Sequence, residues 1–137
     1  MERTLGIVKP DAFGAGRMGA IVDMIQKGGL AVRAVRTLRL SDAQARAFYA
    51  VHAERPFFGS LVEFMTSGPI AAVAIEGENA IARWREIMGA TDPAKAAAGT
   101  VRRIHGTDVQ NNAVHGSDAP ATAAVEVAFF FAGADLV

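Results

Sequence analysis

Segments with the period of a β-strand alternate with segments with the period of an α-helix along this chain, and this order restricts the fold more than any other feature of the sequence. Short apolar or alternating runs predict strands at 3–8, 30–40, 70–75 and 114–115. Apolar residues spaced three and four apart, with capping residues, predict helices near 18–27, 41–49, 58–65, 79–88 and 118–131. Interleaved strands and helices indicate an α/β or α+β fold.

The second strand and the segment 90–113 carry more specific expectations. Alternation within 30–40 predicts a half-buried strand with one apolar face, interrupted by Arg36. The residues expected on that face are Leu30, Val32, Ala34, Leu38 and Leu40. The segment 90–113 has no sustained period, and a loop of this length inside a compact domain usually has a function. After it, Asp118 and Pro120 predict the N-cap and first turn of the last helix.

The composition limits the classes of partner. The 137 residues are expected to form one domain, 1–137, and 14 basic residues balance 14 acidic ones. We therefore expect no specific nucleic-acid binding, and an anion site needs a local basic cluster. The absence of cysteine excludes disulfides and thiolate chemistry and suits a cytoplasmic location. No charge-free apolar run reaches the ~18 residues of a membrane helix.

The densest polar cluster lies near the last predicted strand. Asn112, His115, Ser117 and Asp118 follow one another closely, and Glu126 comes one helical stretch later. A neutral imidazole is a good nucleophile near neutral pH when a carboxylate holds one ring nitrogen, as Glu126 could do for His115. Ser117 could contact a transferred group. The alternative is an ordinary loop histidine beside a helix cap, which the residues alone leave open.

Three scattered cations and one aromatic residue would complete a nucleotide site. Lys9, Arg85 and Arg102 together could offset a polyphosphate that binds near His115, and Thr91 could add a hydroxyl donor. Taken singly, each cation also fits a solvated surface position. Phe57, beside Pro56 and Phe58, could stack on a base without reading its edge, or could belong to the core like Phe58.

Two other patterns suggest different functions. Residues 14–19 match the GxGxxG pattern of a dinucleotide-binding turn, but no acidic residue follows at the required spacing, so helix entry and close packing explain these glycines better. Arg33, Arg36 and Arg39 could contact nucleic acid. With zero net charge, a solvated or interface face is the preferred interpretation.

Six segments in this order resemble the nucleoside diphosphate kinases. They are 3–11, 55–59, 65–69, 88–93, 99–102 and 112–118, the last reading NAVHGSD. The resemblance covers nearly the whole chain and implies a ferredoxin-like sandwich with a four-stranded antiparallel sheet covered by helices. It also implies a ping-pong reaction in which a triphosphate, typically ATP, phosphorylates the pros nitrogen of His115 and another nucleoside diphosphate takes the phosphate, which maintains the NTP and dNTP pools.

The resemblance assigns roles to the other candidate residues. Those expected to support the histidine are Tyr49, Ser117 and Glu126; those expected to bind the nucleotide are Lys9, Phe57, Arg85, Thr91, Arg102 and Asn112. Mg²⁺ is expected on the nucleotide, without protein side chains as ligands.

The resemblance also implies a homo-oligomer, with a tetramer favoured and a hexamer next. The apolar tail 129–132 supports the same expectation, because it needs a partner surface. The stretch 103–111 departs from the usual pattern, which leaves loop conformation and subunit contacts open. A catalytically silent relative that binds nucleotide is the alternative function.

Overall fold

The chain folds around one sheet in the computed structural model, which describes residues 1–137. The strands are β1 (Glu2–Val8), β2 (Ala31–Leu38), β3 (Ile70–Gly77) and β4 (Val114–Gly116). They lie in the order β2-β3-β1-β4, and every neighbouring pair is antiparallel. The four-stranded antiparallel sheet covered by helices, predicted from the sequence, is therefore confirmed.

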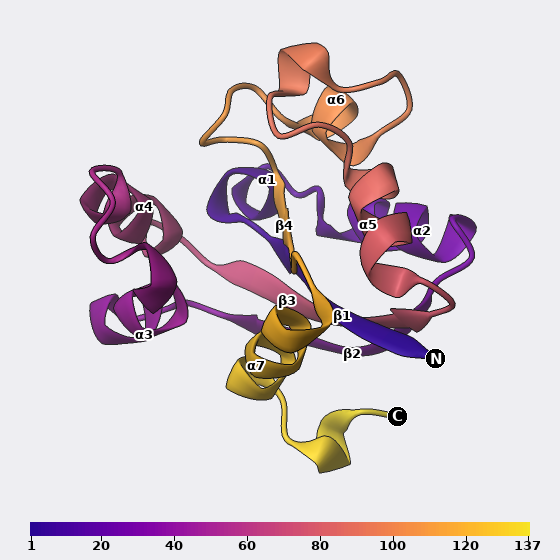
Figure 1. The fold of residues 1–137 in the computed structure, drawn as a ribbon. Helices are drawn as coiled ribbons and strands as arrows, with labels where there is room; N and C mark the ends of the chain where they lie inside the picture. The colour runs from indigo at the N-terminus through magenta and orange to yellow at the C-terminus, as the bar shows by residue number, and fades with distance from the viewer.

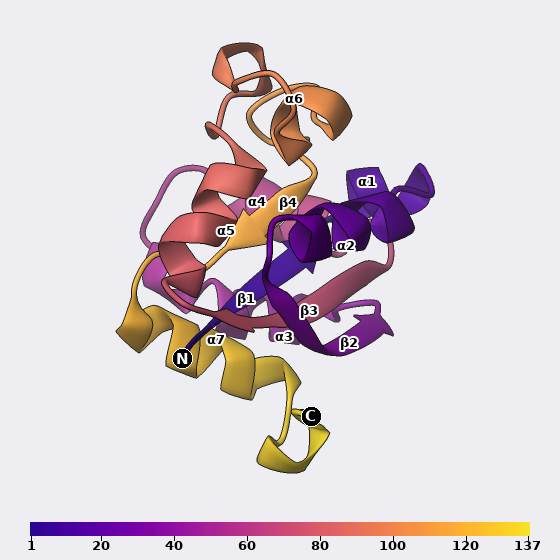
Figure 2. The ribbon, with the colours of Figure 1, turned by 90° about the vertical axis from the view of Figure 1, so that its right-hand side faces the viewer.

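Helices cover both faces of this sheet (Figures 1 and 2). They are α1 (Pro10–Gly14), α2 (Met18–Lys27), α3 (Asp42–Phe48), α4 (Phe58–Met65), α5 (Ala80–Met88), α6 (Val101–His105) and α7 (Pro120–Phe130), with short 3-10 turns at Ala50–His52, Pro93–Lys95 and Gly133–Asp135. One core cluster joins the sheet to α1, α2, α5 and α6, and a second joins the opposite face to α3, α4 and α7. None of the helices has both the length and the apolar character needed to cross a lipid bilayer.

Local signals in the sequence produce several of these boundaries. Ser41 accepts from the backbone N–H of Gln44 at 3.1 Å, and the Gln44 side chain accepts from the Ser41 N–H at 2.9 Å, so the predicted capping box of α3 is formed. Gly89 ends α5 with a φ of 85°, which suits glycine. The segment 90–113 was expected to be a loop, but it contains α6, whose five residues are too few to show a helical period.

The expectation of one apolar face in β2 is wrong. A β-bulge shifts the register between Val32 and Ala34, so Arg33 is the extra residue. Successive side chains of a strand point to opposite faces of the sheet. The extra residue therefore places the apolar residues after it on the face opposite to those before it. Leu30 and Val32 pack in the first core cluster, whereas Ala34, Leu38 and Leu40 pack in the second.

Two expectations for the C-terminal segment also need correction. The N-cap of α7 is Ala119, and the Asp118 carboxylate instead pairs with Arg85 at 3.0 Å. The apolar tail does not require a partner chain for burial, because Phe130 and Phe131 are 3% and 7% exposed in the core of this chain. Phe129 alone of the three phenylalanines keeps a substantial exposed surface, 37%.

Candidate active site

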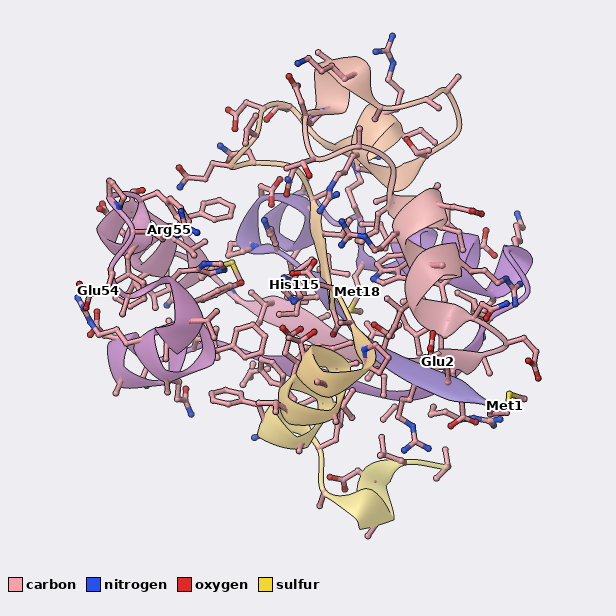
Figure 3. All side chains as sticks on the ribbon, viewed as in Figure 1. Met1, Glu2, Met18, Glu54, Arg55 and His115 are labelled. Carbon is pink, nitrogen blue, oxygen red and sulfur yellow. The ribbon has the colours of Figure 1, made fainter.

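His115 lies in the middle of the short edge strand β4, opposite Ile7 of β1. Figure 3 shows its side chain near the centre of the molecule, between the α3–α4 side and α5. Trp84 of α5 fixes the backbone at this point, because its indole Nε1 donates to the carbonyl oxygen of His115 at 3.3 Å. A Cβ at Gly116 would lie 2.8 Å from that indole nitrogen, so only glycine allows β4 to lie this close to α5.

The imidazole of His115 is oriented by a carboxylate. Its Nε2 lies 2.7 Å from Oε1 of Glu126, and Ser117 Oγ donates to the same oxygen at 2.8 Å. Burial by itself would raise the pKa of Glu126, but the hydrogen bonds from His115 and Ser117 and nearby positive charge outweigh it, and the pKa is lowered. An ionised acceptor favours a proton on Nε2, which leaves the lone pair of Nδ1 free to react.

Ser117 contacts Glu126 and β1 and does not line the cleft. Its side chain is buried, at 1% exposure, and its Oγ also accepts from the backbone N–H of Leu5 at 3.3 Å. The hydroxyl therefore ties Glu126 to β1 and has no place in the cleft. The sequence suggested that Ser117 could contact a transferred group, and the geometry instead makes it a support for Glu126.

Two aromatic rings border the imidazole. The centroid of Phe48 lies 5.6 Å from that of His115 and the centroid of Tyr49 lies 6.3 Å from it, both in edge-on arrangements. The hydroxyl of Tyr49 is buried without a hydrogen-bond partner. Burial, together with the charge of Glu126, raises the pKa of Tyr49, so its proton is retained and available for donation.

Lys9 directly follows β1, and a series of hydrogen bonds holds its side chain. Its Nζ donates to Oδ1 of Asn112 at 2.9 Å, and Nδ2 of Asn112 donates to the backbone oxygen of Thr91 at 3.1 Å. Burial, and then the charge of Arg102, lower the pKa of Lys9 to about 8, while Asp11 acts in the opposite direction.

The guanidinium of Arg102 is fixed by backbone carbonyl groups. It donates to Gly89 O at 3.0 Å and to Val114 O at 2.9 Å, and the residue is 8% exposed. Burial, and then the charge of Arg85, lower the pKa of Arg102 to about 10. Arg102 thus repels both Lys9 and Arg85, and a bound polyanion would relieve that repulsion.

A cleft of about 370 Å³ brings the predicted residues together. All the candidates named from the sequence line it except the buried Ser117: Lys9, Tyr49, Phe57, Arg85, Thr91, Arg102, Asn112, His115 and Glu126. Phe48 and Val109 also line the cleft, and the sequence did not indicate either residue. The pairing of Asp118 with Arg85 was likewise not predicted. Adjacency to Tyr49 was the available signal for Phe48, and no signal marked Val109.

The outer part of the site opens beside α4. Phe57, which precedes α4, is 48% exposed, so the core interpretation of this residue is excluded. Phe58 is half-buried against the second core cluster, as expected for a core residue. Phe57, Ser60 and Leu61 face Val109 and Gln110 across a cavity of about 520 Å³ that Lys9 and Thr91 also line. Phe57 and Val109 give this cavity apolar walls, against which a flat aromatic group can pack.

The carboxylates of the cleft are already engaged. Asp118 pairs with Arg85, and Glu126 accepts from His115 and Ser117. No group of three or more His, Asp or Glu side chains gathers as a metal site. Mg²⁺ commonly keeps several waters and binds through substrate phosphates, so this donor set fits a cation carried by the nucleotide.

The sequence of this chain matches a known family over nearly its whole length. A model of that family, described as nucleoside diphosphate kinase, matches residues 2–136. The chain belongs to the nucleoside diphosphate kinase family. Relatives of that name from Nitrobacter hamburgensis and from Rhodopseudomonas palustris strain HaA2 are 56% and 54% identical over 137 residues, which is all of this chain and 98% of each relative.

Solved structures of the nucleoside diphosphate kinase family have the same fold. The Aquifex aeolicus enzyme is 47% identical, with a TM-score of 0.97 and 99% of each chain covered. The Halobacterium salinarum enzyme, solved in complex with CDP, is 40% identical, with a TM-score of 0.95 over 99% of this chain and 91% of that one. These comparisons confirm the family, the fold and the kinase function that the sequence predicted.

Proposed function

We propose that His115 carries the phosphate in the reaction of this kinase, with its Nδ1 as the nucleophile. The observation that supports this most directly is the Glu126-held imidazole, which shares one cleft with Lys9, Arg85 and Arg102. Arg102 repels the other two cations. In the first half-reaction Nδ1 attacks the γ-phosphorus of a nucleoside triphosphate such as ATP. An N–P bond forms, the bond to the β–γ bridging oxygen breaks, and the diphosphate leaves. In the second half-reaction the terminal oxygen of another nucleoside diphosphate attacks the phosphorus of the phosphohistidine. An O–P bond forms, the N–P bond breaks, and the new triphosphate leaves with His115 restored.

The residues around His115 have separate proposed tasks. Arg85, Thr91 and Arg102 bind the phosphates, where little beyond position and charge is needed for phosphoryl transfer. Lys9 and Asn112 contact the ribose and the phosphates. Glu126 and Ser117 orient the imidazole, and the unpartnered hydroxyl of Tyr49 donates toward the reacting group. Mg²⁺, when bound, arrives on the nucleotide and offsets phosphate charge.

The substrates and setting belong to the same proposal. ATP and other nucleoside di- and triphosphates are the proposed ligands, with no specific nucleic acid. Residues 1–137 act as one domain, supported by the single sheet on which both core clusters pack. A cytoplasmic location is proposed because the sequence has no cysteine, and the fold adds nothing to that proposal.

Alkaline pH should weaken nucleotide capture through Lys9. Its pKa of about 8 means that the free enzyme holds this charge below pH 8 and loses it as the pH rises through 8. The kcat/KM for a nucleoside diphosphate, which reports on the free enzyme, should therefore fall above pH 8.

Lys9→Arg provides the test, because a guanidinium keeps its charge to above about pH 12. The fall near pH 8 should vanish in this variant even if its activity is lower throughout. An unchanged alkaline fall in Lys9→Arg would assign that titration to another group.

Phe57 should contribute equally to every base. Stacking uses the ring face, which all bases have, and is worth about 1–3 kcal/mol per base. We expect kcat/KM values for purine and pyrimidine diphosphates, ribo and deoxy, to lie within about 100-fold of one another. Phe57→Ala should raise each KM by at least about fivefold without changing their order. A variant that changes the order of preference would show that Phe57 reads base identity.

A homo-oligomer, with a tetramer preferred and a hexamer next, is also proposed. The structure removes the argument from the tail, but β2 remains an unpaired edge strand on which Val35 is 45% exposed. Exposed edge strands pair readily with another chain, and a lysine at such an edge opposes pairing. Light scattering after size exclusion should give a mass near four times 14.4 kDa, and a smaller mass for Val35→Lys. A stable monomer of the unmodified chain would contradict the proposal.

A further inference from the structure

A tight backbone turn comes immediately before the strand that carries His115. Ala113 has a φ of 73°, and across it the N–H of Val114 donates to the carbonyl oxygen of Asn112 at 2.9 Å. This hydrogen bond, with positive φ at the central residue, defines the rare and strained form of the γ-turn. The turn lies between Asn112, which holds Lys9, and His115, so its shape sets the relative positions of both.

Residues 9–11 form hydrogen bonds with both backbone polar groups of Ala113, its N–H and its carbonyl oxygen. The backbone N–H of Lys9 donates to the carbonyl oxygen of Ala113 at 2.8 Å, and the N–H of Ala113 donates to Oδ2 of Asp11 at 3.1 Å. Ala113 is fully buried, so water cannot replace either contact. Strained backbone of this kind persists only where its surroundings hold it.

The carboxylate of Asp11 has no direct part in the proposed chemistry, although its charge raises the pKa of Lys9. It does not line the cleft around His115, and its contact with Ala113 is the one hydrogen bond that its side chain makes. Its Oδ1 is buried without any partner. A carboxylate oxygen that is buried without a partner is costly, so the presence of Asp11 needs an explanation other than stability.

We propose that Asp11 is a positioning residue, which holds Ala113 in the γ-turn and thereby fixes His115 relative to Glu126 and the phosphate-binding cations. Without this acceptor, Ala113 can relax to the negative φ that alanine prefers, and β4 then begins in a different direction. The inference rests on the proposed role of His115.

The test compares kcat and KM of five proteins at about pH 6, well below the Lys9 pKa of about 8, because loss of the Asp11 charge lowers that pKa further. Asp11→Ala should lower kcat by about 10- to 100-fold, the scale of a small misplacement of a reacting group. The double variant Asp11→Ala with Ala113→Gly should recover at least about half of that loss on a logarithmic scale, because glycine adopts positive φ without strain. Asp11→Asn keeps an oxygen acceptor for Ala113 and should stay within about threefold of the unmodified chain.

Asp23→Ala is the matched control, since Asp23 pairs with Lys27 on the exposed side of α2 and should leave kcat unchanged. A kcat for Asp11→Ala equal to that of the control would overturn the inference, as would a loss that Ala113→Gly does not reduce. If Asp11→Ala does not fold, Asp11→Asn still decides. Its kcat near that of the unmodified chain supports the hydrogen-bond role, and a tenfold loss overturns it.

The same proteins separate this inference from the proposed function. Phosphate from γ-labelled ATP should appear on His115 in the unmodified chain and more slowly on His115 in Asp11→Ala. Absence of label on His115 in the unmodified chain contradicts the proposed function. Label on His115 at equal rates in both proteins contradicts only the role of Asp11.

Discussion

Replacing His115 with alanine should abolish both phosphoenzyme formation and nucleotide exchange, with a loss of at least about 10⁴-fold in kcat. The reason is chemical, because the variant has no Nδ1 to form the N–P bond and the two half-reactions have no shared intermediate. In the unmodified chain, incubation with γ-labelled ATP should leave acid-labile, base-stable phosphate on the protein, as expected of a phosphoramidate. This experiment also tests the alternative of a catalytically silent nucleotide-binding relative.

His105→Ala is the matched control. His105 lies on α6 and does not line the cleft, so its loss should leave labelling and exchange intact. Full labelling of the His115→Ala protein on another residue would disprove the proposed nucleophile. A folded, unmodified chain that takes up no label would instead support the silent alternative.

Glu126→Gln should also have a large effect, a loss of about 100-fold in kcat with little change in nucleotide binding. The carboxylate accepts both from Ser117 and from Nε2 of His115, at 2.8 Å and 2.7 Å. An amide oxygen in the place of Oε1 can still accept from both groups, but it carries no charge. The imidazole gains positive charge as Nδ1 attacks the phosphorus, and an amide stabilises that charge less than a carboxylate does.

The exposed Glu63 of α4 offers the control, since Glu63→Gln removes the same charge away from the cleft. Single-turnover labelling with ATP separates the chemical step from binding. A Glu126→Gln protein that forms phosphoenzyme at the unmodified rate would show that the charge of Glu126 does not assist the attack of Nδ1.

Contacts between residues that are close in sequence could be predicted, whereas contacts between distant residues could not. His115, Ser117 and Glu126 lie close in sequence, and a strand followed by a helix start places them together, so their cluster was visible before the fold was known. The bond between Lys9 and Asn112 joins residues far apart in the chain, and only the pairing of β1 with β4 brings them into contact. The family resemblance placed both residues at the nucleotide, which periodicity could not, and the structure shows the contact between them.

The errors in the fold have equally specific causes. The bulge at Arg33 leaves no mark in an alternating sequence, because apolar residues continue on both sides of it. The pairing of Asp118 with Arg85 depends on α5, a distant element, whereas capping is a local signal that many aspartates share. Phe130 and Phe131 looked like an interface because a sequence does not show how far a last helix can turn back onto its own sheet.

The contact between Trp84 and β4 gives this protein an optical reporter of its own chemistry. Trp84 is the only tryptophan, is 1% exposed, and donates its indole hydrogen to the backbone of the proposed nucleophile. Any charge or shift added at His115 changes the field around that indole, and with it the fluorescence emission. Stopped-flow mixing with a triphosphate can therefore follow formation of the phosphoenzyme, and mixing with a diphosphate its decay, without a label on either reactant.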